Sequence, residues 1–342
     1  MKATILTKFG EPGVLEAGDA ATPTWRADQM LVRVAACGVC GHDLLNRQGH
    51  FPDTHPPCVM GHEIAGVVEE TGELVKAFKP GDRVALTQRI SCGICAVCRA
   101  GRDNLCRSGP GFYGEQLSGG YGEFVVASER NTVPLPPEID LEVGAILSCA
   151  IGTGWHALHR ARLQAGDTVV VTAASGGVGL HTVELARMLG LHVIATTSSD
   201  RKADSLREAG AHHVIAAPDG SFHKTVRELT DGAGADAVIE IAGAPTFGSS
   251  LRSLVAGGRL VAVGNVQPGA VQLNPALPIL KEIEIVGSAH ALVSDLQRVI
   301  DLVARGLVVP RIAERLPAKD AAHAHVLLES RAAPGRVVLM QA

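Results

Sequence analysis

The sequence is poor in aromatic residues and has no excess of positive charge. Aromatic side chains make up 3% of its 342 residues, which argues against a large pocket built by ring stacking. The formal net charge is −4, and no basic run or basic amphipathic helix is present. A polyanion-binding protein needs such a basic surface. We therefore expect a small-molecule substrate and neither nucleic acid nor membrane as a partner.

Long apolar runs are also scarce. Residues 1–6 pass into Thr7 and Lys8, and then into Glu11 and Pro12, too early for the apolar core of a signal peptide. We expect no later apolar run to be long enough to cross a bilayer. The sequence therefore predicts a cytoplasmic protein.

What the chain does contain is enough apolar material, 46% of its residues, for two separate cores. Up to about residue 150 it is dense in Gly and Pro and has short β-branched runs at 30–34, 64–69 and 82–86, which predicts an irregular β-rich domain. From residue 166, about six apolar strands alternate with helical stretches, which predicts a parallel sheet with crossover helices. The last stretch, 311–342, is expected to rejoin the first domain.

The clearest motif is a set of four closely spaced cysteines. Cys92, Cys95, Cys98 and Cys106 follow a C-x2-C-x2-C-x7-C spacing in a loop-like segment. Four thiolates so placed can close a tetrahedral zinc site with no position left for substrate. We predict a structural zinc here; a redox disulfide pair and an iron–sulfur cluster are the alternatives.

A second set of metal-binding residue types is dispersed along the chain. Cys40, His62 and Cys149 supply two thiolates and an imidazole, and three protein ligands with an open fourth position are typical of a catalytic zinc. Asp43 is placed to accept a hydrogen bond from the second ring nitrogen of His62. Glu63 is a further candidate, as a metal ligand or as a nearby charge.

A buried cysteine is often no more than a small apolar side chain. This is the alternative for Cys149, whose place in the chain gives it no near partner. It is also our interpretation of Cys37 and Cys58, because the other six cysteines account for both expected metal sites.

A glycine-rich turn follows the first strand of the expected parallel sheet. Ala174, Gly176 and Gly179 occupy its three fingerprint positions, between a strand at 168–172 and a helix. In such a turn the backbone amides and the helix N-terminus approach the pyrophosphate of a dinucleotide. The expected contacts are Ala174, Ser175, Gly176, Gly177, Val178 and Gly179. A tight turn without a ligand is the alternative.

The next strand ends without the acidic residue that usually binds the ribose 2′-hydroxyl of NAD. Two hydroxyls and two cations follow instead, which suits a 2′-phosphate. The residues expected to contact it are Thr197, Ser198, Ser199, Arg201 and Lys202. We therefore favour NADP(H) over NAD(H), with Asp200 left as a possible partner of the NAD ribose.

Together these motifs resemble the zinc-containing medium-chain dehydrogenase/reductase family along essentially the whole chain. Cys40, Asp43, His62 with Glu63, the four-cysteine segment, Cys149 and the glycine-rich turn follow the order of that family. The resemblance implies an α/β protein with a GroES-like β-rich catalytic domain, 1–150 completed by 289–342. It further implies a doubly wound Rossmann domain, 151–288, and a cleft between the two. A homodimer or homotetramer is implied as well.

The same resemblance assigns further roles. It implies two Zn²⁺ ions per subunit, one catalytic and one structural. Thr153 should border the nicotinamide ring, and Val263 and Gly264 should lie beside its carboxamide. His42 departs from the pattern, because the alcohol dehydrogenases of the family have Ser or Thr there to pass on the alcohol proton; a histidine can also relay a proton. Leu45 and Gly41 replace other relay or phosphate-contacting residues of some members.

These departures keep two enzymatic functions open. The first is a zinc-dependent oxidoreductase that interconverts an alcohol and an aldehyde or ketone by hydride transfer with NAD(P)(H). The second is an NADPH-dependent reductase of the C=C bond of an enoyl thioester or a quinone, because residues 37–45, 113–117, 175–180, 196–199 and 264–266 look similar to the archaeal acryloyl-coenzyme A reductases. The complete Cys40, His62 and Cys149 set favours the first. A dinucleotide sensor without turnover is the non-enzymatic alternative.

Overall fold

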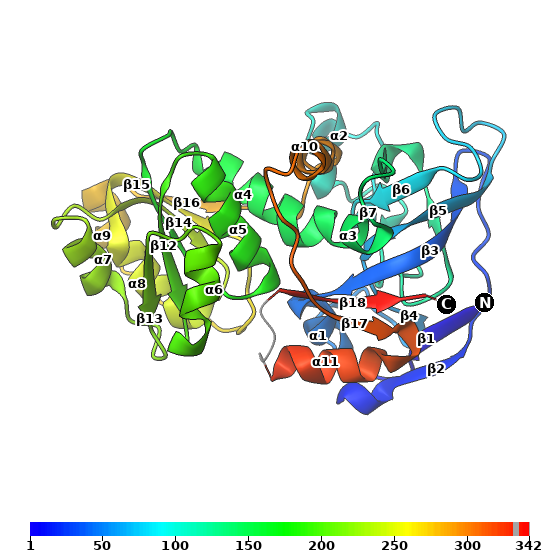
Figure 1. The fold of residues 1–342 in the computed structure, drawn as a ribbon, viewed down its shortest axis with the longest axis horizontal. Helices are drawn as coiled ribbons and strands as arrows, with labels where there is room; N and C mark the ends of the chain where they lie inside the picture. The colour runs from blue at the N-terminus through cyan, green and yellow to red at the C-terminus, as the bar shows by residue number, and fades with distance from the viewer. Residues whose placement is uncertain (331–334, 342) are drawn as a thin grey trace. The chain divides into compact units, whose positions relative to one another are not determined.

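The computed structural model describes residues 1–330 and 335–341, shown as a ribbon in Figure 1. The chain forms two compact units. One consists of Met1–Gly152 and His290–Ala342, and the other of Thr153–Ala289. Each unit has its own sheet structure.

The Thr153–Ala289 unit is built on a six-stranded parallel sheet with the order β13-β12-β11-β14-β15-β16. Its strands are β11 (Thr168–Val171), β12 (His192–Thr197), β13 (His213–Ala216), β14 (Ala235–Glu240), β15 (Leu254–Ala262) and β16 (Glu284–Gly287). The first strand lies in the middle and the chain moves outward on one side and then on the other, which is the doubly wound order of a Rossmann sheet. The fold class predicted for this part of the chain is confirmed.

The central strands of this sheet are buried on both faces. Val169, Val170 and Val171 of β11 are all 0% exposed, as expected for parallel strands that are covered by helices on both sides. The helices of the unit are α4 (Gly152–Ala161), α5 (Gly177–Met188), α6 (Ala203–Glu208), α7 (His223–Leu229), α8 (Ala244–Ser253) and α9 (Ala276–Lys281). Helix α7 was not expected from the sequence, because it carries a single buried apolar position, Val226, and so shows little periodicity.

The other unit contains three antiparallel or mixed sheets among its described residues. A seven-stranded sheet has the order β10-β6-β5-β3-β18-β17, with β9 also paired to β3; a three-stranded sheet has the order β2-β1-β4, and β7 pairs with β8. The strands are β1 (Lys2–Leu6), β2 (Leu15–Asp19), β3 (Met30–Val39), β4 (Cys58–Val59), β5 (Glu63–Thr71), β6 (Arg83–Leu86), β7 (Arg89–Ile90), β8 (Gly111–Phe112), β9 (Phe124–Ala127), β10 (Thr132–Pro134), β17 (Ile312–Pro317) and β18 (Arg336–Met340). This β-rich architecture confirms the predicted GroES-like class.

The end of the chain is part of this β-rich unit. Strand β18 pairs antiparallel with β3, where Cys37 faces Leu339 and Val39 faces Val337 in register, and parallel with β17. Figure 1 shows β18, in red, among the strands of the seven-stranded sheet. The helices of the unit are α1 (Gly41–Arg47), α2 (Ala96–Arg99), α3 (Leu141–Ile146), α10 (Val293–Ala304) and α11 (Ala321–Glu329).

A continuous helical stretch, Leu141–Ala161, corrects one expectation. It joins α3 to α4 through a π-helical turn, Leu147–Ile151. By length and composition alone its 21 residues could cross a membrane, although no run of that kind was expected from the sequence. In the structure 72% of its most apolar 18-residue window is buried inside the protein, as is usual for the core helix of a globular protein.

Candidate metal centres and dinucleotide site

Four side chains from three separate segments form one compact group of metal-donor atoms, here called the Cys40 cluster. One donor atom each of Cys40, His62, Glu63 and Cys149 lies within 4.8 Å of the others. Cys40 caps the N-terminus of α1 directly after β3, His62 and Glu63 lie at the start of β5, and Cys149 lies in the π-helical turn. A single extra residue in a helix turn often marks a functional site, because it redirects one side chain.

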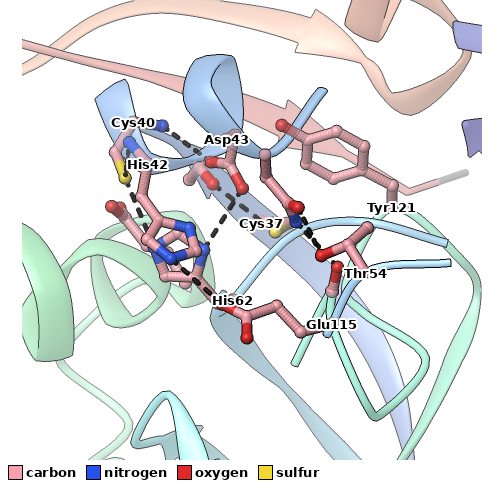
Figure 2. A network of polar contacts seen from close by, with 12 residues as sticks. Cys37, Cys40, His42, Asp43, Thr54, His62, Glu115 and Tyr121 are labelled. Carbon is pink, nitrogen blue, oxygen red and sulfur yellow. Dashed lines mark hydrogen bonds and ion pairs between the residues drawn. The ribbon is translucent and has the colours of Figure 1, made fainter. Parts of the chain in front are cut away.

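The local structure around Cys40 fixes its direction. The backbone amide of Cys40 donates to Asp43 Oδ2 at 2.9 Å, and the amide of His42 donates to Cys40 Sγ at 3.3 Å, which together form a capping box. The same carboxylate reaches His62, with 3.2 Å between Asp43 Oδ1 and His62 Nδ1. Figure 2 shows this chain of contacts from Cys40 through Asp43 to His62.

Asp43 orients the ring of His62 toward the sulfur atoms. His62 Nδ1 faces the carboxylate of Asp43 at 3.2 Å, and Nε2 faces Cys40 Sγ at 3.3 Å. Burial disfavours the charged imidazole, but the charges of Asp43 and Cys40 outweigh it and raise the pKa of His62. A carboxylate that holds the far nitrogen in this way fixes the tautomer of a metal-binding histidine.

The two cysteines of the cluster are poised to hold a cation. A hydrogen bond from Cys149 lowers the pKa of the Cys40 thiol well below its ordinary value, while the pKa of Cys149 is raised. A proton in the hydrogen bond between the two sulfur atoms therefore favours the charged form of Cys40 over that of Cys149. Zinc binding requires thiolates, and a bound cation would displace this proton.

Glu63 is the deepest charge of the cluster. Its side chain is 0% exposed, and Oε1 lies 3.1 Å from the guanidinium of Arg336 on β18. Burial raises the pKa of Glu63 to about 7, against the attraction of Arg336. Gly38 on β3 makes room for this carboxylate, because a Cβ at that position would lie 2.1 Å from Glu63 Oε2. Position 38 therefore has to be glycine for Glu63 to reach the cluster.

The residues of the Cys40 cluster fit a zinc ion. Apart from the ion pair between Oε1 and Arg336, the two carboxylate oxygens of Glu63 are buried without a hydrogen-bond partner among the described residues, which is costly unless a cation satisfies them. Sulfur, imidazole nitrogen and carboxylate oxygen are the donors that zinc prefers. His42, Asp43 and His62 form a second possible donor group, which shares His62 with the first.

The four predicted cysteines also meet. One sulfur atom each of Cys92, Cys95, Cys98 and Cys106 lies within 4.8 Å of the others, and the Cys95–Cys98 pair is 3.4 Å apart. The backbone amides of Cys92 and Cys95 donate to sulfur at 3.2 and 3.3 Å, and backbone hydrogen bonds lower the pKa of Cys92 to about 6. All eight cysteines of the chain are free thiols, so no disulfide competes for them.

Cys37 and Cys58 lie outside both donor groups. Cys37 is 0% exposed and belongs to the apolar core, and burial raises its pKa. Cys58 is only partly buried, and burial raises its pKa to about 11. The pKa values of both thiols are therefore shifted in the direction opposite to that of Cys40.

The ring of His42 is surrounded by aromatic side chains and a carboxylate, which sequence reasoning missed in part. The ring of His42 stacks on Phe51, with 4.1 Å between centroids, and lies 5.1 Å from Phe112. Its Nε2 lies 3.2 Å from Glu115 Oε1, and Figure 2 shows the two side chains pointing toward each other. Glu115 was not expected, since nothing in its spacing connects it with His42.

His290 is a second residue near the ring of His42 that was not expected from the sequence. Its ring centroid lies 5.0 Å from that of Phe112, and its backbone has a φ of +56°. A residue other than glycine with such a φ is under local strain, which often marks a functional position. Burial lowers the pKa of His290 to about 3, so the ring is neutral.

In the Rossmann unit the glycine-rich turn connects β11 to α5. Ala173 has a φ of +46°, and the amide of Ala174 donates to the carbonyl of Thr196 at 3.0 Å, which ties the turn to β12. Gly179 is required by close contact, because a Cβ there would lie 2.5 Å from the carbonyl oxygen of Ala173. Gly176, Gly177 and Val178 form the cap and first turn of α5.

The end of β12 presents hydroxyl groups. Thr197 is the last residue of that strand, and its Oγ1 lies 3.4 Å from Ser175 Oγ in the glycine-rich turn. Ser199 Oγ accepts from the amide of Arg201 at 3.3 Å, while Ser198 and Arg201 are exposed and Lys202 is partly buried. The end of β12 and the glycine-rich turn thus lie together at the carboxyl ends of the parallel strands.

A buried carboxylate organises the neighbouring strand end. Glu240, 0% exposed, accepts from Thr172 at 2.8 Å and from the amide of Gly243 at 3.0 Å, and its carbonyl accepts from the amide of Val263 at 2.8 Å. At Gly264 a Cβ would lie 2.3 Å from the carbonyl oxygen of Ile241. Sequence reasoning missed Glu240, which holds the loop that carries Val263 and Gly264. Thr153, the remaining predicted contact, is buried in α4.

Comparison with known proteins places the chain in a family. Residues 26–137 match the family model of the alcohol dehydrogenase GroES-like domain, and residues 177–305 match that of the zinc-binding dehydrogenases. The chain is 34% identical over 340 residues to the acryloyl-coenzyme A reductase of Metallosphaera sedula, with 99% of each chain covered. It is 31% identical to the NAD-dependent alcohol dehydrogenase of Sulfurisphaera tokodaii, with 99% of this chain and 100% of that one covered.

A solved structure agrees. The crystal structure of AibC superimposes with a TM-score of 0.94 at 44% identity and covers 100% of this chain and 96% of that one. The protein therefore belongs to the zinc-containing medium-chain dehydrogenase/reductase family, and it is an oxidoreductase of that family. This confirms the resemblance deduced from the order of its motifs.

Proposed function

We propose that this protein is a zinc-dependent oxidoreductase that interconverts an alcohol and an aldehyde or ketone with NAD(P)(H). The observation that carries the proposal is the Cys40 cluster, in which thiolate, imidazole and carboxylate donors meet within 4.8 Å. Cys40, His62 and Cys149 would hold the catalytic zinc, and Glu63 would serve as a fourth ligand or as a nearby charge. When bound, zinc supplies Lewis acidity toward an oxygen atom, and the nicotinamide supplies or accepts the hydride.

The residues of the chain itself have distinct roles in this proposal. Asp43 keeps the imidazole of His62 in one orientation through the 3.2 Å contact with Nδ1. Arg336 stabilises the charge of Glu63 in an interior that would otherwise keep this carboxyl protonated. Phe51 and Phe112 pack on the ring of His42 and exclude water from one side of it, which strengthens the polar contacts that remain. His42 is the residue that we expect to contact the substrate oxygen.

We further propose a structural zinc on Cys92, Cys95, Cys98 and Cys106, and NADP(H) as the preferred cofactor. The four sulfur atoms supply a complete set of ligands, so this structural site needs no further side chain. For the cofactor, the hydroxyl groups of Ser175 and Thr197 lie 3.4 Å apart beside the glycine-rich turn, and Ser199 contacts Thr197 through its backbone. Strand β12 ends on Thr197 rather than on an acidic residue. Arg201 and Lys202 would supply the positive charge for a 2′-phosphate. The compact units at Met1–Gly152 with His290–Ala342 and at Thr153–Ala289 would then serve as the catalytic and dinucleotide-binding domains.

A second candidate function is NADPH-dependent reduction of the C=C bond of an enoyl thioester. The acryloyl-coenzyme A reductase of Metallosphaera sedula matches 99% of the chain, and this observation favours the second function as specifically as the cluster favours the first. The two functions differ in which bond of a conjugated substrate takes the hydride.

The test uses a molecule that offers both bonds. Zinc-loaded protein is incubated with NADPH and cinnamaldehyde, and the products are separated. Cinnamyl alcohol as the product supports the proposed function, whereas hydrocinnamaldehyde contradicts it in favour of C=C reduction. Cys149→Ala should abolish the reaction, and Cys58→Ala is the matched control because Cys58 lies outside both donor groups.

We also propose that the protein forms a homodimer or homotetramer. Strand β16 has a single neighbour in its sheet, β15, and helix α9 exposes Ile279 by 71% and Leu280 by 83%. An unpaired strand edge beside large exposed apolar side chains is a liability unless another chain covers it. Light scattering after size exclusion should give a multiple of the 35.5 kDa chain mass, and Leu280→Glu should shift it toward the monomer.

A further inference from the structure

The ring of His42 has one nitrogen that is engaged and one that is not. Nε2 lies 3.2 Å from a carboxylate oxygen of Glu115, and both side chains are largely buried, at 21% and 12% exposure. Nδ1 is buried and has no hydrogen-bond partner among residues 1–330 and 335–341. A buried polar atom without a partner is uncommon in native proteins and needs an explanation.

The position of the ring is determined from several sides. It stacks on Phe51 at an interplanar angle of 20°, lies tilted over Phe112, and meets His62 edge to face with 4.9 Å between centroids. One nitrogen of His42 also lies within 4.8 Å of a donor atom of His62. His42 is therefore packed directly beside the Cys40 cluster.

Glu115 is itself held in place by its own segment. The neighbouring Gln116 accepts from the amide of Phe112 at 2.8 Å and donates to Asp53 at 2.9 Å. Burial lowers the pKa of Arg89, and the nearby Glu115 carboxylate counteracts that shift, so a cation faces Glu115 from strand β7. These contacts hold the segment of Glu115 and place its carboxylate toward His42.

An ionised carboxylate can only accept a hydrogen bond, and this decides the tautomer of a neutral His42. The proton has to sit on Nε2, where it is donated to Glu115. Nδ1 then carries a lone pair, points away from this contact and can only accept. We propose that Glu115 is a positioning residue that fixes this tautomer, and that His42 Nδ1 accepts a hydrogen bond from the hydroxyl group of the substrate alcohol.

This inference rests on the proposed function and narrows its substrate class. Of the two candidate reactions, only the first includes a substrate, the alcohol, whose hydroxyl proton can be donated to Nδ1. The C=C bond and the thioester of an enoyl thioester offer no donor, so binding such a substrate would leave Nδ1 unpaired. Sites built to bond a hydroxyl discriminate strongly against analogues that lack it.

The tautomer is tested without turnover. Zinc-loaded protein labelled with ¹⁵N in histidine is examined by long-range ¹H–¹⁵N NMR, and the His42 signals are assigned by their loss in His42→Phe. We expect an unprotonated Nδ1 and a protonated Nε2 in the wild type, and a mixture of tautomers in Glu115→Ala. A protonated Nδ1, or an Nδ1 shift that appears only on zinc loading and marks a metal ligand, overturns the proposal.

The substrate half is tested by kinetics with cinnamyl alcohol and NADP⁺. Glu115→Ala and His42→Phe should each raise KM for the alcohol about tenfold, as expected for one hydrogen bond, with a smaller change in kcat. The double variant should resemble His42→Phe, because Glu115 acts through His42. His42→Asn, whose Oδ1 can replace the lost acceptor, should restore KM and make it independent of Glu115.

The two proposals fail in distinguishable ways. If Glu115→Ala raises KM in His42→Phe by the same factor as in the wild type, Glu115 does not act through His42. That result overturns the positioning role. If the protein reduces only the C=C bond of cinnamaldehyde, the proposed function and the hydroxyl contact both fail, while the NMR result still decides the Glu115–His42 tautomer. Glu129→Ala serves as the control substitution. Glu129 accepts hydrogen bonds from the backbone amides of Lys76 and Ala77, and both contacts are exposed.

Discussion

The four-cysteine loop and the Cys40 cluster gather their donor atoms within the same 4.8 Å, but they are built in opposite ways. The first takes all four ligands from 15 consecutive residues and uses backbone amides to stabilise its thiolates. The second takes its ligands from three distant segments and surrounds them with buried charges, above all Asp43 and Arg336. A local loop is sufficient to close a site around a metal, whereas a reactive site needs donors whose charge and direction are set by the whole unit.

The largest predicted effect comes from removing a ligand of the Cys40 cluster. His62→Ala should lower kcat/KM by about 10³-fold or more, because an electrostatic contact to the reacting oxygen is lost with the metal. Metal analysis should show one zinc lost per chain while the four-cysteine loop keeps the other. A variant that retains two zincs and full activity would contradict the catalytic assignment. Cys58→Ala should retain both.

The reverse experiment removes a ligand of the four-cysteine loop. Cys98→Ser should lose the other zinc and lower the free energy of unfolding by about 3 kcal/mol, comparable to losing a disulfide that closes a similar loop. Thermal unfolding should shift downward by roughly 6–12 °C. Because the Cys40 cluster is assembled elsewhere, kcat per intact site should change little at low temperature. A selective loss of kcat with unchanged stability would show that this loop is catalytic.

A third prediction concerns how α1, which follows Cys40, is anchored. Arg47 lies 3.3 Å from His325 Nδ1 and also pairs with Glu329, and Tyr121 lies 3.0 Å from His325 Nε2. Burial, the largest cause, lowers the pKa of His325 to about 4. The unfolded chain therefore binds a proton near pH 6.5 that the folded protein takes up only near pH 4, so stability falls as pH falls through this window.

This linkage can be measured with zinc-loaded protein. Between pH 7 and pH 5 the wild type should lose about 2 kcal/mol more of its unfolding free energy than His325→Gln, which cannot titrate. His323→Gln, at an exposed position of the same helix, should follow the wild type. Parallel pH curves for wild type and His325→Gln would show that His325 does not contribute to the acid sensitivity of the unit.

The smallest predicted effect lies outside the unit that holds both donor groups. Arg201→Ala should reduce the preference for NADPH over NADH in kcat/KM by about tenfold, since one charge-assisted contact to a 2′-phosphate is lost. Arg207→Ala, which instead removes an exposed pair with Asp204, is the matched control. Zinc content should stay unchanged in both. An unchanged cofactor ratio in Arg201→Ala would exclude this guanidinium from cofactor selection.

The residues that could be predicted are those whose neighbours in sequence are also neighbours in space. The four cysteines needed only a short loop to meet. Gly179 could be assigned from its strand and helix, and the structure explains it by the 2.5 Å approach to Ala173. The interval between Cys40 and Asp43 spans one helical turn, so their contact is local too.

The missed residues come from segments that the fold alone brings together. Arg336 reaches Glu63 because β18 pairs with β3, some 300 residues apart in the chain. Glu115 lies on the segment after β8 and meets His42 on α1, and nothing in the spacing of the two predicts an ion pair. The helical stretch Leu141–Ala161 was not expected from the sequence, and its π-helical turn at 147–151 carries Cys149 to the cluster.

The sequence alone was enough to predict the two parts of this protein: a β-rich part with two sets of possible metal donors, and a parallel sheet with a glycine-rich turn. These features could be predicted because they depend on patterns over a few residues: hydrophobic periodicity, glycine placement and short cysteine spacings. Only the tertiary structure decided the protonation and direction of the reactive groups, because these depend on burial and on charges from distant segments. The carboxyl of Glu63, the thiolate of Cys40 and the free nitrogen of His42 owe their chemistry to that packing.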